Sequence, residues 1–272
     1  MVAVERVRFT KERETLLATL YARALDAGSR RAVLGDPYAA EAVRHIEYDF
    51  RKTGIRPARA GSLMLRVAQL DRWTRDFLAA HPEAVVLHLG CGLDTRVHRI
   101  DPGAGVSWYD VDYPDVIELR RRLLPERDAY QMIGASVTDE GWLSSIPGDR
   151  PVFVVTEGLT MYLTEDQGAR LLRRITDHFS HGEVAFDVFS RFAIRSQKIN
   201  HVVRRAGATL HWGIDDPREL ERMNPRLNSV EVRTYADAEG IDRLPAPQRV
   251  ILRGFLRVPS FRKMSVLLRY RF

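Results

Sequence analysis

From residue 84 onward, short apolar runs alternate with segments of helical periodicity, and this alternation restricts the chain to few architectures. The apolar runs have the length of strands and occupy residues 84–89, 106–111, 130–133, 151–156, 184–189, 230–232 and 265–270, and helical patterns occupy 114–124, 165–180 and 217–223. Runs that are apolar throughout are typical of strands buried on both faces. The sequence therefore predicts an α/β fold in which a parallel sheet is covered by helices on both sides.

The first 80 residues carry helical periodicity instead. Apolar side chains recur at helical spacing near 16–24, after Asp36-Pro37, and over 62–80. The pair Asp36-Pro37 is typical of an N-cap followed by proline at the first helical position. Residues 191–216 are too many for a plain connection and predict a helical insertion, with its helix at about 193–205. We expect a single domain of residues 1–272, with a helical N-terminal cap over 1–80 and an α/β core over 81–272 that contains the insertion.

Composition and charge exclude several other classes. Of the 272 residues, 45% are hydrophobic and 29% are charged, which is ordinary for a globular protein. The net charge of +6 comes from scattered arginines, so we expect a solvated surface and no nucleic-acid partner. No apolar run is long enough to span a bilayer and no signal peptide is visible, which predicts no membrane partner. The single cysteine, Cys91, suits a reducing compartment and predicts a cytoplasmic protein.

A glycine loop follows the first predicted strand of the core. Gly90 and Gly92 allow the backbone to turn sharply and to approach a ligand closely. The third glycine of a dinucleotide-binding loop is replaced by Thr95, and Asp94 beside it would repel a pyrophosphate. The loop therefore favours S-adenosylmethionine (SAM) over NAD, and a mere tight turn is the alternative interpretation.

Acidic residues follow two of the other predicted strands. Asp110 and Asp112 point to the same side of their strand, and one of them can instead cap the helix at Pro114. We favour Asp112 as the acceptor of ribose hydroxyls because it lies nearer the carboxyl end of the strand, where open α/β sheets bind ligands. Glu157 follows the fourth strand, and a capping box at 164–167 already serves the next helix, so we expect Glu157 to be free for the cleft.

Three motifs together, LGCGLDTR, YDVDYP and TEGLTMYL, resemble the leucine carboxyl methyltransferase family. The resemblance is greatest to the bacterial branch that includes the tetracenomycin-type polyketide O-methyltransferases, and it covers about residues 15–225. It implies a Rossmann-like class I methyltransferase fold, whose seven-stranded sheet is mostly parallel with one reversed edge strand. It also implies SAM as the methyl donor and S-adenosylhomocysteine as the product.

The resemblance assigns roles to residues that match the family's cofactor site. Gly90 and Gly92 match its glycine motif, and its ribose-binding acid and its acid after the fourth strand match Asp112 and Glu157. The family's arginine before the first strand matches Arg66, which would bind the methionine carboxylate in a forked geometry. From the residues alone, a solvated helix arginine is the favoured interpretation of Arg66. A further basic residue of the family corresponds loosely to Arg23.

One departure from the family pattern concerns the adenine. Ser136, followed by Val137, stands where the family usually has an aspartate facing the adenine amino group. A hydroxyl is the weaker acceptor, so three outcomes are open. SAM affinity is reduced, Asp139 compensates, or the chain has drifted from methyl transfer.

The acceptor pocket is expected between the N-terminal helices, the loop 159–163 and the insertion. The candidate catalytic residues are Tyr21, Tyr162 and His211, and other aromatic or polar candidates there are His45, Tyr48, Phe189, Arg191, Phe192, His201 and Trp212. This aromatic content suits a flat, apolar acceptor, either a hydroxyl or a carboxylate of a polyketide-like molecule of secondary metabolism. No metal site is expected. A SAM-binding protein with a cyclase-like or scaffold role is the alternative function, and a homodimer is left open.

Overall fold

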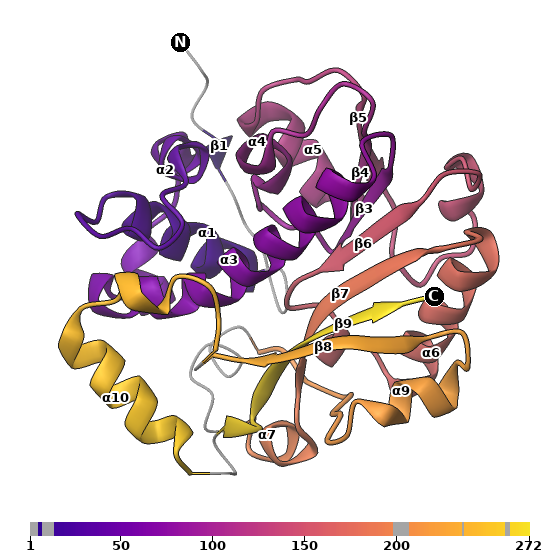
Figure 1. Ribbon diagram of the computed structural model, residues 1–272. Coiled ribbons are helices and arrows are strands. Elements are labelled where there is room, and N and C mark those ends of the chain that lie inside the picture. Colours follow the sequence, from indigo (N-terminus) through magenta and orange to yellow (C-terminus); the bar gives the residue numbers. More distant parts are fainter. Residues whose placement is uncertain (1–4, 7–13, 198–206, 236, 259–261) are drawn as a thin grey trace.

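The computed structural model describes the chain except residues 1–4, 7–13, 198–206, 236 and 259–261 (Figure 1). Its centre is a seven-stranded sheet with the order β5-β4-β3-β6-β7-β9-β8. The strands are β3 (Val85–Leu89), β4 (Ser107–Asp112), β5 (Tyr130–Gly134), β6 (Val152–Thr156), β7 (Gly182–Phe189), β8 (Asn228–Thr234) and β9 (Ser265–Arg271). All seven predicted strands are thus present, with bounds within a few residues of those expected. A separate two-stranded sheet pairs β1 (Glu5–Arg6) with β2 (Ile46–Glu47).

The reversed strand of the large sheet is β9, which pairs antiparallel with both β7 and β8. It therefore lies one strand in from the edge, and the expectation of a reversed edge strand was wrong in this detail. The edge strand β8 precedes β9 in sequence. After β7 the chain therefore forms the edge strand first, and β9 then inserts between β7 and β8. The five strands β5, β4, β3, β6 and β7 pair in parallel, as their apolar runs predicted.

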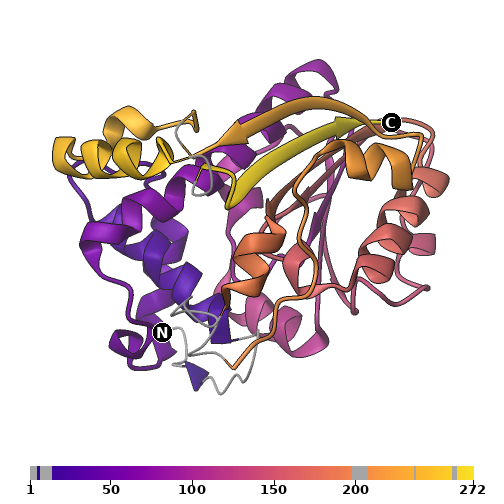
Figure 2. The same ribbon diagram turned by 90° about the horizontal axis from the view of Figure 1, so that it is seen from below.

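Helices cover both faces of the sheet, as Figures 1 and 2 show. On one face, Trp73 and Phe77 of α3 (Pro57–Ala80) pack with Phe153 of β6 in one apolar cluster. On the other, Leu171 and Ile175 of α6 (Glu165–His178) pack with strand residues of a second cluster. The other α-helices of the described residues are α1 (Glu14–Ala27), α2 (Pro37–Arg44), α4 (Arg96–Ile100), α5 (Pro114–Leu123), α7 (Arg191–Arg195), α9 (Arg218–Met223) and α10 (Ala246–Leu256). None of the helices within the described residues is long and apolar enough to cross a membrane.

Local sequence signals explain several helix ends. Asp36 accepts a hydrogen bond from the Ala39 N–H (3.1 Å) as the N-cap of α2, and Thr164 and Gln167 form the expected capping box of α6. The third helix begins at Pro57 rather than at residue 62, because Pro57 is tolerated in a first helical turn. Helix α10 was not predicted. The predicted helix 193–205 overlaps α7, and residues 198–206 lie outside the described residues.

Candidate active site

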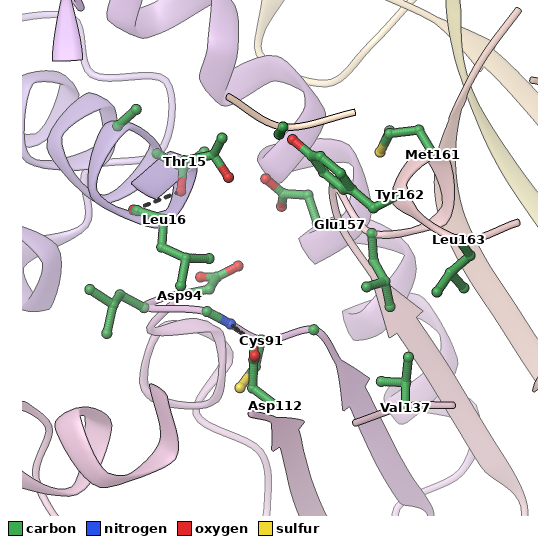
Figure 3. Close-up of a pocket in the computed structure, with 18 of the residues that line it drawn as sticks. Thr15, Leu16, Cys91, Asp94, Asp112, Val137, Glu157, Met161, Tyr162 and Leu163 are labelled. Carbon is green, nitrogen blue, oxygen red and sulfur yellow. Dashed lines mark hydrogen bonds between the residues drawn. The ribbon is translucent and has the colours of Figure 1, made fainter. Parts of the chain in front are cut away.

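A cavity of about 700 Å³ lies at the carboxyl ends of β3, β4 and β6, and it is closed on one side by α1 and α3. This volume is in the range of small-molecule sites. Figure 3 shows Asp112, Glu157 and Tyr162 directed into the space beside α1. Of the residues singled out from the sequence, the lining includes Arg23, Arg66, Gly90, Gly92, Asp112, Ser136, Val137, Glu157, Tyr162 and His211.

The glycine loop needs its glycines for conformation and for space. Gly90 and Gly92 both have positive φ, +61° and +49°, which L side chains rarely adopt. A Cβ on Gly92 would also lie 2.6 Å from Cδ2 of Leu16 on α1. The glycines therefore allow the loop to pack closely against α1 while its backbone borders the cavity.

Asp112, at the end of β4, is tied to this loop. Its Oδ2 accepts a hydrogen bond from the Gly92 N–H (2.7 Å), and its Oδ1 accepts one from the Tyr113 N–H (2.7 Å). Burial raises the pKa of Asp112, although these two hydrogen bonds act in the opposite direction. The carboxylate thus has a fixed orientation at the cavity wall and a raised affinity for a proton.

Asp110 has a different environment from its neighbour two residues on. It is fully buried, and its carboxylate accepts hydrogen bonds from Tyr130 Oη (2.5 Å) and Trp108 Nε1 (2.8 Å) and pairs with Arg120. Burial would raise the pKa of Asp110, but Arg120 and His88 lower it to about 2. Asp110 is not part of the cavity lining, so of the two acids only Asp112 borders the cavity.

Glu157 does not cap the helix that follows it, because Thr164 and Gln167 do, and it lines the cavity while paired with two arginines. Its Oε1 accepts hydrogen bonds from Nε (3.2 Å) and Nη2 (3.0 Å) of Arg66, and its Oε2 accepts one from Nη2 of Arg96 (2.7 Å). Burial would raise the pKa of Glu157, but these two arginines lower it. The acid still lines the cavity. The sequence did not predict these two partners, because they come from α3 and α4, far away in the chain.

Arg66 reaches the cavity from α3 with its side chain 17% exposed. Besides Glu157 it binds Asp187 of β7, with 2.9 Å between Nη1 and Oδ2. Burial would lower the pKa of Arg66, but the two carboxylates raise it well above its ordinary value. Arg66 is therefore a charged group that two carboxylates hold in place, and it is not the solvated helix arginine of the alternative interpretation.

Arg23 and Asp94 form the wall between α1 and the glycine loop. Arg23 is 4% exposed and lies 3.5 Å from Asp94 Oδ2, measured from Nη2. Burial would raise the pKa of Asp94, but Arg23, Arg99 and Arg96 lower it well below its ordinary value. Asp94 is therefore neutralised by its neighbours, and sequence reasoning missed this because it treated the acid as an isolated charge.

Ser136 and Val137 line the cavity after β5. The Ser136 hydroxyl lies 2.8 Å from Thr138 Oγ1, and the Ser136 N–H donates to Asp139 Oδ2 (3.1 Å). Asp139 is exposed and is not among the lining residues. The carboxylate of Asp139 instead closes the turn after β5. The structure therefore does not support Asp139 as a replacement for the family aspartate at the adenine.

The candidate acceptor residues separate into two groups. Tyr162, Phe189 and His211 line the cavity. Tyr21 does not, and its ring stacks on Phe50 with centroids 5.1 Å apart. The other described candidates also lie away from the lining. Tyr48 contacts Phe50, His45 pairs with Glu41, and Arg191 pairs with Glu219. Phe192 is exposed, Trp212 is buried against α6, and His201 lies outside the described residues.

Several lining residues were not predicted. Thr15, Leu16 and Thr19 recur at the helical spacing that also includes Arg23, so the face of α1 that carries Arg23 could have identified them. Met64 lies near Arg66 on α3. Tyr235 follows β8, and no sequence signal near it indicated a site.

Comparison with known proteins gives consistent results. Residues 1–176 match the family described as leucine carboxyl methyltransferase. The chain is 46% identical to the tetracenomycin polyketide synthesis O-methyltransferase TcmP of Streptomyces glaucescens, over 98% of this chain and 99% of that one. It is 41% identical to the S-adenosyl-L-methionine-dependent methyltransferase dpfgK of Gibberella zeae, over 82% of each chain.

Solved structures support the fold. A crystal structure of a Thermobifida fusca protein assigned as a methyltransferase matches with a TM-score of 0.59 and 21% identity, over 92% of this chain and 93% of that one. The geranyl diphosphate C-methyltransferase of Streptomyces coelicolor, in complex with S-adenosyl-L-homocysteine, matches with a TM-score of 0.51 and 15% identity, over 89% and 85%. The chain belongs to the leucine carboxyl methyltransferase family and is a SAM-dependent methyltransferase.

Proposed function

We propose that the protein transfers the methyl group of SAM to an oxygen of a small aromatic, polyketide-like acceptor, a hydroxyl or a carboxylate, in secondary metabolism. The observation that carries this proposal is the presence in one cavity of a strand-end carboxylate held on a glycine loop, Asp112, and a buried guanidinium, Arg66. The near full-length similarity to TcmP, named as a polyketide O-methyltransferase, supports the acceptor class.

The residues present fit the cofactor. A carboxylate has about four acceptor positions, and Asp112 uses one on each oxygen for backbone N–H groups, which leaves capacity for two ribose hydroxyls. A guanidinium has five N–H donors. Three of those of Arg66 bind Glu157 and Asp187, and two have no partner among the described residues. These two can bind the methionine carboxylate, while Ser136 and Val137 border the adenine.

The chemistry that SAM supplies is an electrophilic methyl group on a positively charged sulfur. The chain's contribution is to hold the acceptor oxygen in line with that methyl group, since alignment supplies much of the rate acceleration. Tyr162, Phe189 and Met161 provide a largely apolar wall for a flat ring. His211 lies at the exposed rim of the cavity and can accept the proton of a hydroxyl acceptor, whereas a carboxylate acceptor needs no base.

Labelled SAM tests the proposal. The protein is incubated with methyl-labelled SAM and a panel of aromatic phenols and aromatic carboxylic acids, and both labelled product and S-adenosylhomocysteine are measured. We expect equal amounts of the two with at least one acceptor. Binding of SAM without either product across the panel would favour the cyclase-like or scaffold alternative, which the presence of Ser136 keeps open.

Variants of the acceptor half refine the test. Tyr162→Phe and His211→Gln should lower kcat or raise the KM for the acceptor and leave SAM affinity unchanged. Tyr21→Phe is the matched control, because Tyr21 stacks on Phe50 and does not line the cavity. A loss of activity in the control equal to that in the two variants would contradict the assignment.

We further propose that the protein acts in the cytoplasm. The support is its single cysteine, Cys91, which is buried and unpaired, as is usual in a reducing compartment.

A further inference from the structure

Asp187 is a buried carboxylate that nothing in the cofactor chemistry above uses. It lies on β7, the neighbour of β6, and its side chain is 1% exposed. It is not among the residues that line the cavity. Its surroundings nevertheless connect it to the cavity through two other groups.

The two oxygens of Asp187 bind two different elements. Oδ2 accepts a hydrogen bond from Nη1 of Arg66 on α3 (2.9 Å), and Oδ1 accepts one from the N–H of Gly158 (2.6 Å). The backbone carbonyl of Asp187 also accepts a hydrogen bond from Thr160 Oγ1 (2.6 Å). One residue thus joins β7 to the helix that carries the guanidinium and to the turn that carries Glu157.

Gly158 has a close spatial relation to the guanidinium. It has a φ of +67°, and a Cβ built on it would lie 3.8 Å from Nη2 of Arg66. The turn and the guanidinium are therefore packed against one another, and Asp187 fixes both. Glu157 holds Nε and Nη2 of Arg66 through one oxygen, and Asp187 holds Nη1, so the two acids together anchor all three nitrogens of the guanidinium.

We propose that Asp187 is a positioning residue for cofactor binding, which holds the Arg66 guanidinium and the Gly158 turn so that the two remaining N–H groups of Arg66 face the methionine carboxylate. This rests on the proposed function, since it requires Arg66 to bind that carboxylate. Asp187 acts through Arg66 and does not contact the cofactor. A guanidinium with two anchors loses less freedom on binding a planar anion than one that can rotate.

The test compares ligands with and without the carboxylate. Binding of SAM, S-adenosylhomocysteine and 5′-methylthioadenosine, which lacks the amino-acid part, is measured by calorimetry on the wild type and on Asp187→Asn. The asparagine keeps an oxygen for the Gly158 N–H but cannot pair with Arg66. We expect the dissociation constants of SAM and S-adenosylhomocysteine to rise about tenfold and that of 5′-methylthioadenosine to stay within twofold.

A double-mutant comparison separates positioning from general damage. In an Arg66→Ala background, Asp187→Asn should change SAM affinity by less than twofold, because its effect passes through Arg66. Asp26→Asn is the matched control: Asp26 is a buried carboxylate that accepts hydrogen bonds from the N–H groups of Val33, Leu34 and Gly35, away from the cavity. It should lower the thermal midpoint and leave the ratio of SAM to 5′-methylthioadenosine affinity unchanged.

The outcomes distinguish this proposal from the proposed function. If the wild type does not bind SAM, the proposed function fails. If the wild type binds SAM and Arg66→Ala weakens it, while Asp187→Asn binds all three ligands as the wild type does or loses them equally, the role of Asp187 is refuted. Asp187→Ser is a second variant, and it keeps a small hydrogen-bond acceptor. If Asp187→Asn and Asp187→Ser both unfold, Asp187 serves the fold alone and the proposal is overturned.

Discussion

The carboxylate of Asp112 accepts the N–H of Gly92, 2.7 Å from Oδ2, and so joins the end of β4 to the glycine loop after β3. This bond fixes the acid at the cavity wall although the two residues are separated by twenty positions in the chain. Gly92 also has a positive φ, which L side chains rarely adopt, and Leu16 leaves no space for a side chain there. The loop and the acid are therefore one unit, and changes in either should affect the same ligand group.

Asp112→Ala should weaken SAM binding by about 1–3 kcal/mol, the scale of charge-assisted hydrogen bonds that are lost in a buried site. Calorimetric titration measures this directly. Asp139→Ala is the control, since Asp139 closes the neighbouring turn but does not line the cavity. An equal loss in the control would mean that Asp139 does compensate for Ser136.

As the pH is lowered, SAM affinity should begin to fall at a higher pH than the ordinary pKa of an aspartate would predict. Burial raises the pKa of Asp112 above its usual value of 3.8, so the carboxylate takes up a proton at higher pH and then accepts hydrogen bonds from ribose less well. Binding measured from neutral to acid pH checks this. Asp112→Asn has no such titration, and an unchanged acid limb in that variant would assign the effect to another group.

Asp110→Asn should destabilise the fold rather than act on the ligand. Its removal leaves Arg120 buried without its ionic partner, which costs about 3–5 kcal/mol. Because the folded pKa of Asp110 is about 2 against an ordinary value of 3.8, its contribution is present above pH 3.8 and is lost as the pH falls through about 2. Urea unfolding at several pH values measures both effects. Weaker SAM binding with unchanged stability would reverse our assignment of the two acids.

Arg66→Ala should weaken SAM by about 1.5–3 kcal/mol and hardly affect adenosine, which has no carboxylate. Arg66→Lys should restore only part of the affinity, because an ammonium cannot fork onto two oxygens. Arg72→Ala on the same helix is the control, since Arg72 is exposed and pairs with Glu239. Equal loss of SAM and adenosine affinity would indicate damage to α3 rather than loss of a ligand contact.

The sequence predicted the centre of the sheet well, because the strands there are buried on both faces and appear as continuous apolar runs: β3, β4, β6 and β7. The choice of Asp112 over Asp110 followed from position along one strand, a local property. The turn at Thr164 and the cap at Asp36 were also local signals, and both were confirmed. Helix α10 was not predicted; none of its residues is buried, and several of its apolar side chains, such as Ile251 and Phe255, are exposed, so they do not mark one inward face.

The charges around the cavity could not be predicted from sequence in the same way. Arg96 and Arg99 both bind Asp71, and Arg96 also binds Glu157, so that four charged groups from three elements neutralise one another in the interior. Such pairing depends on the packing of α3, α4 and β6, whereas a single sequence places charged residues at the surface by default. Tyr21 was expected at the cavity for a similar reason. Helical spacing shows which residues share a face of α1, but it does not show which part of the protein that face packs against.

The most direct test of the account is a calorimetric titration of the protein with SAM and, separately, with NAD. We expect saturable binding of SAM with one site per chain and no measurable binding of NAD, because Thr95 stands where a dinucleotide-binding loop needs its third glycine. Binding of NAD together with no binding of SAM would contradict the account.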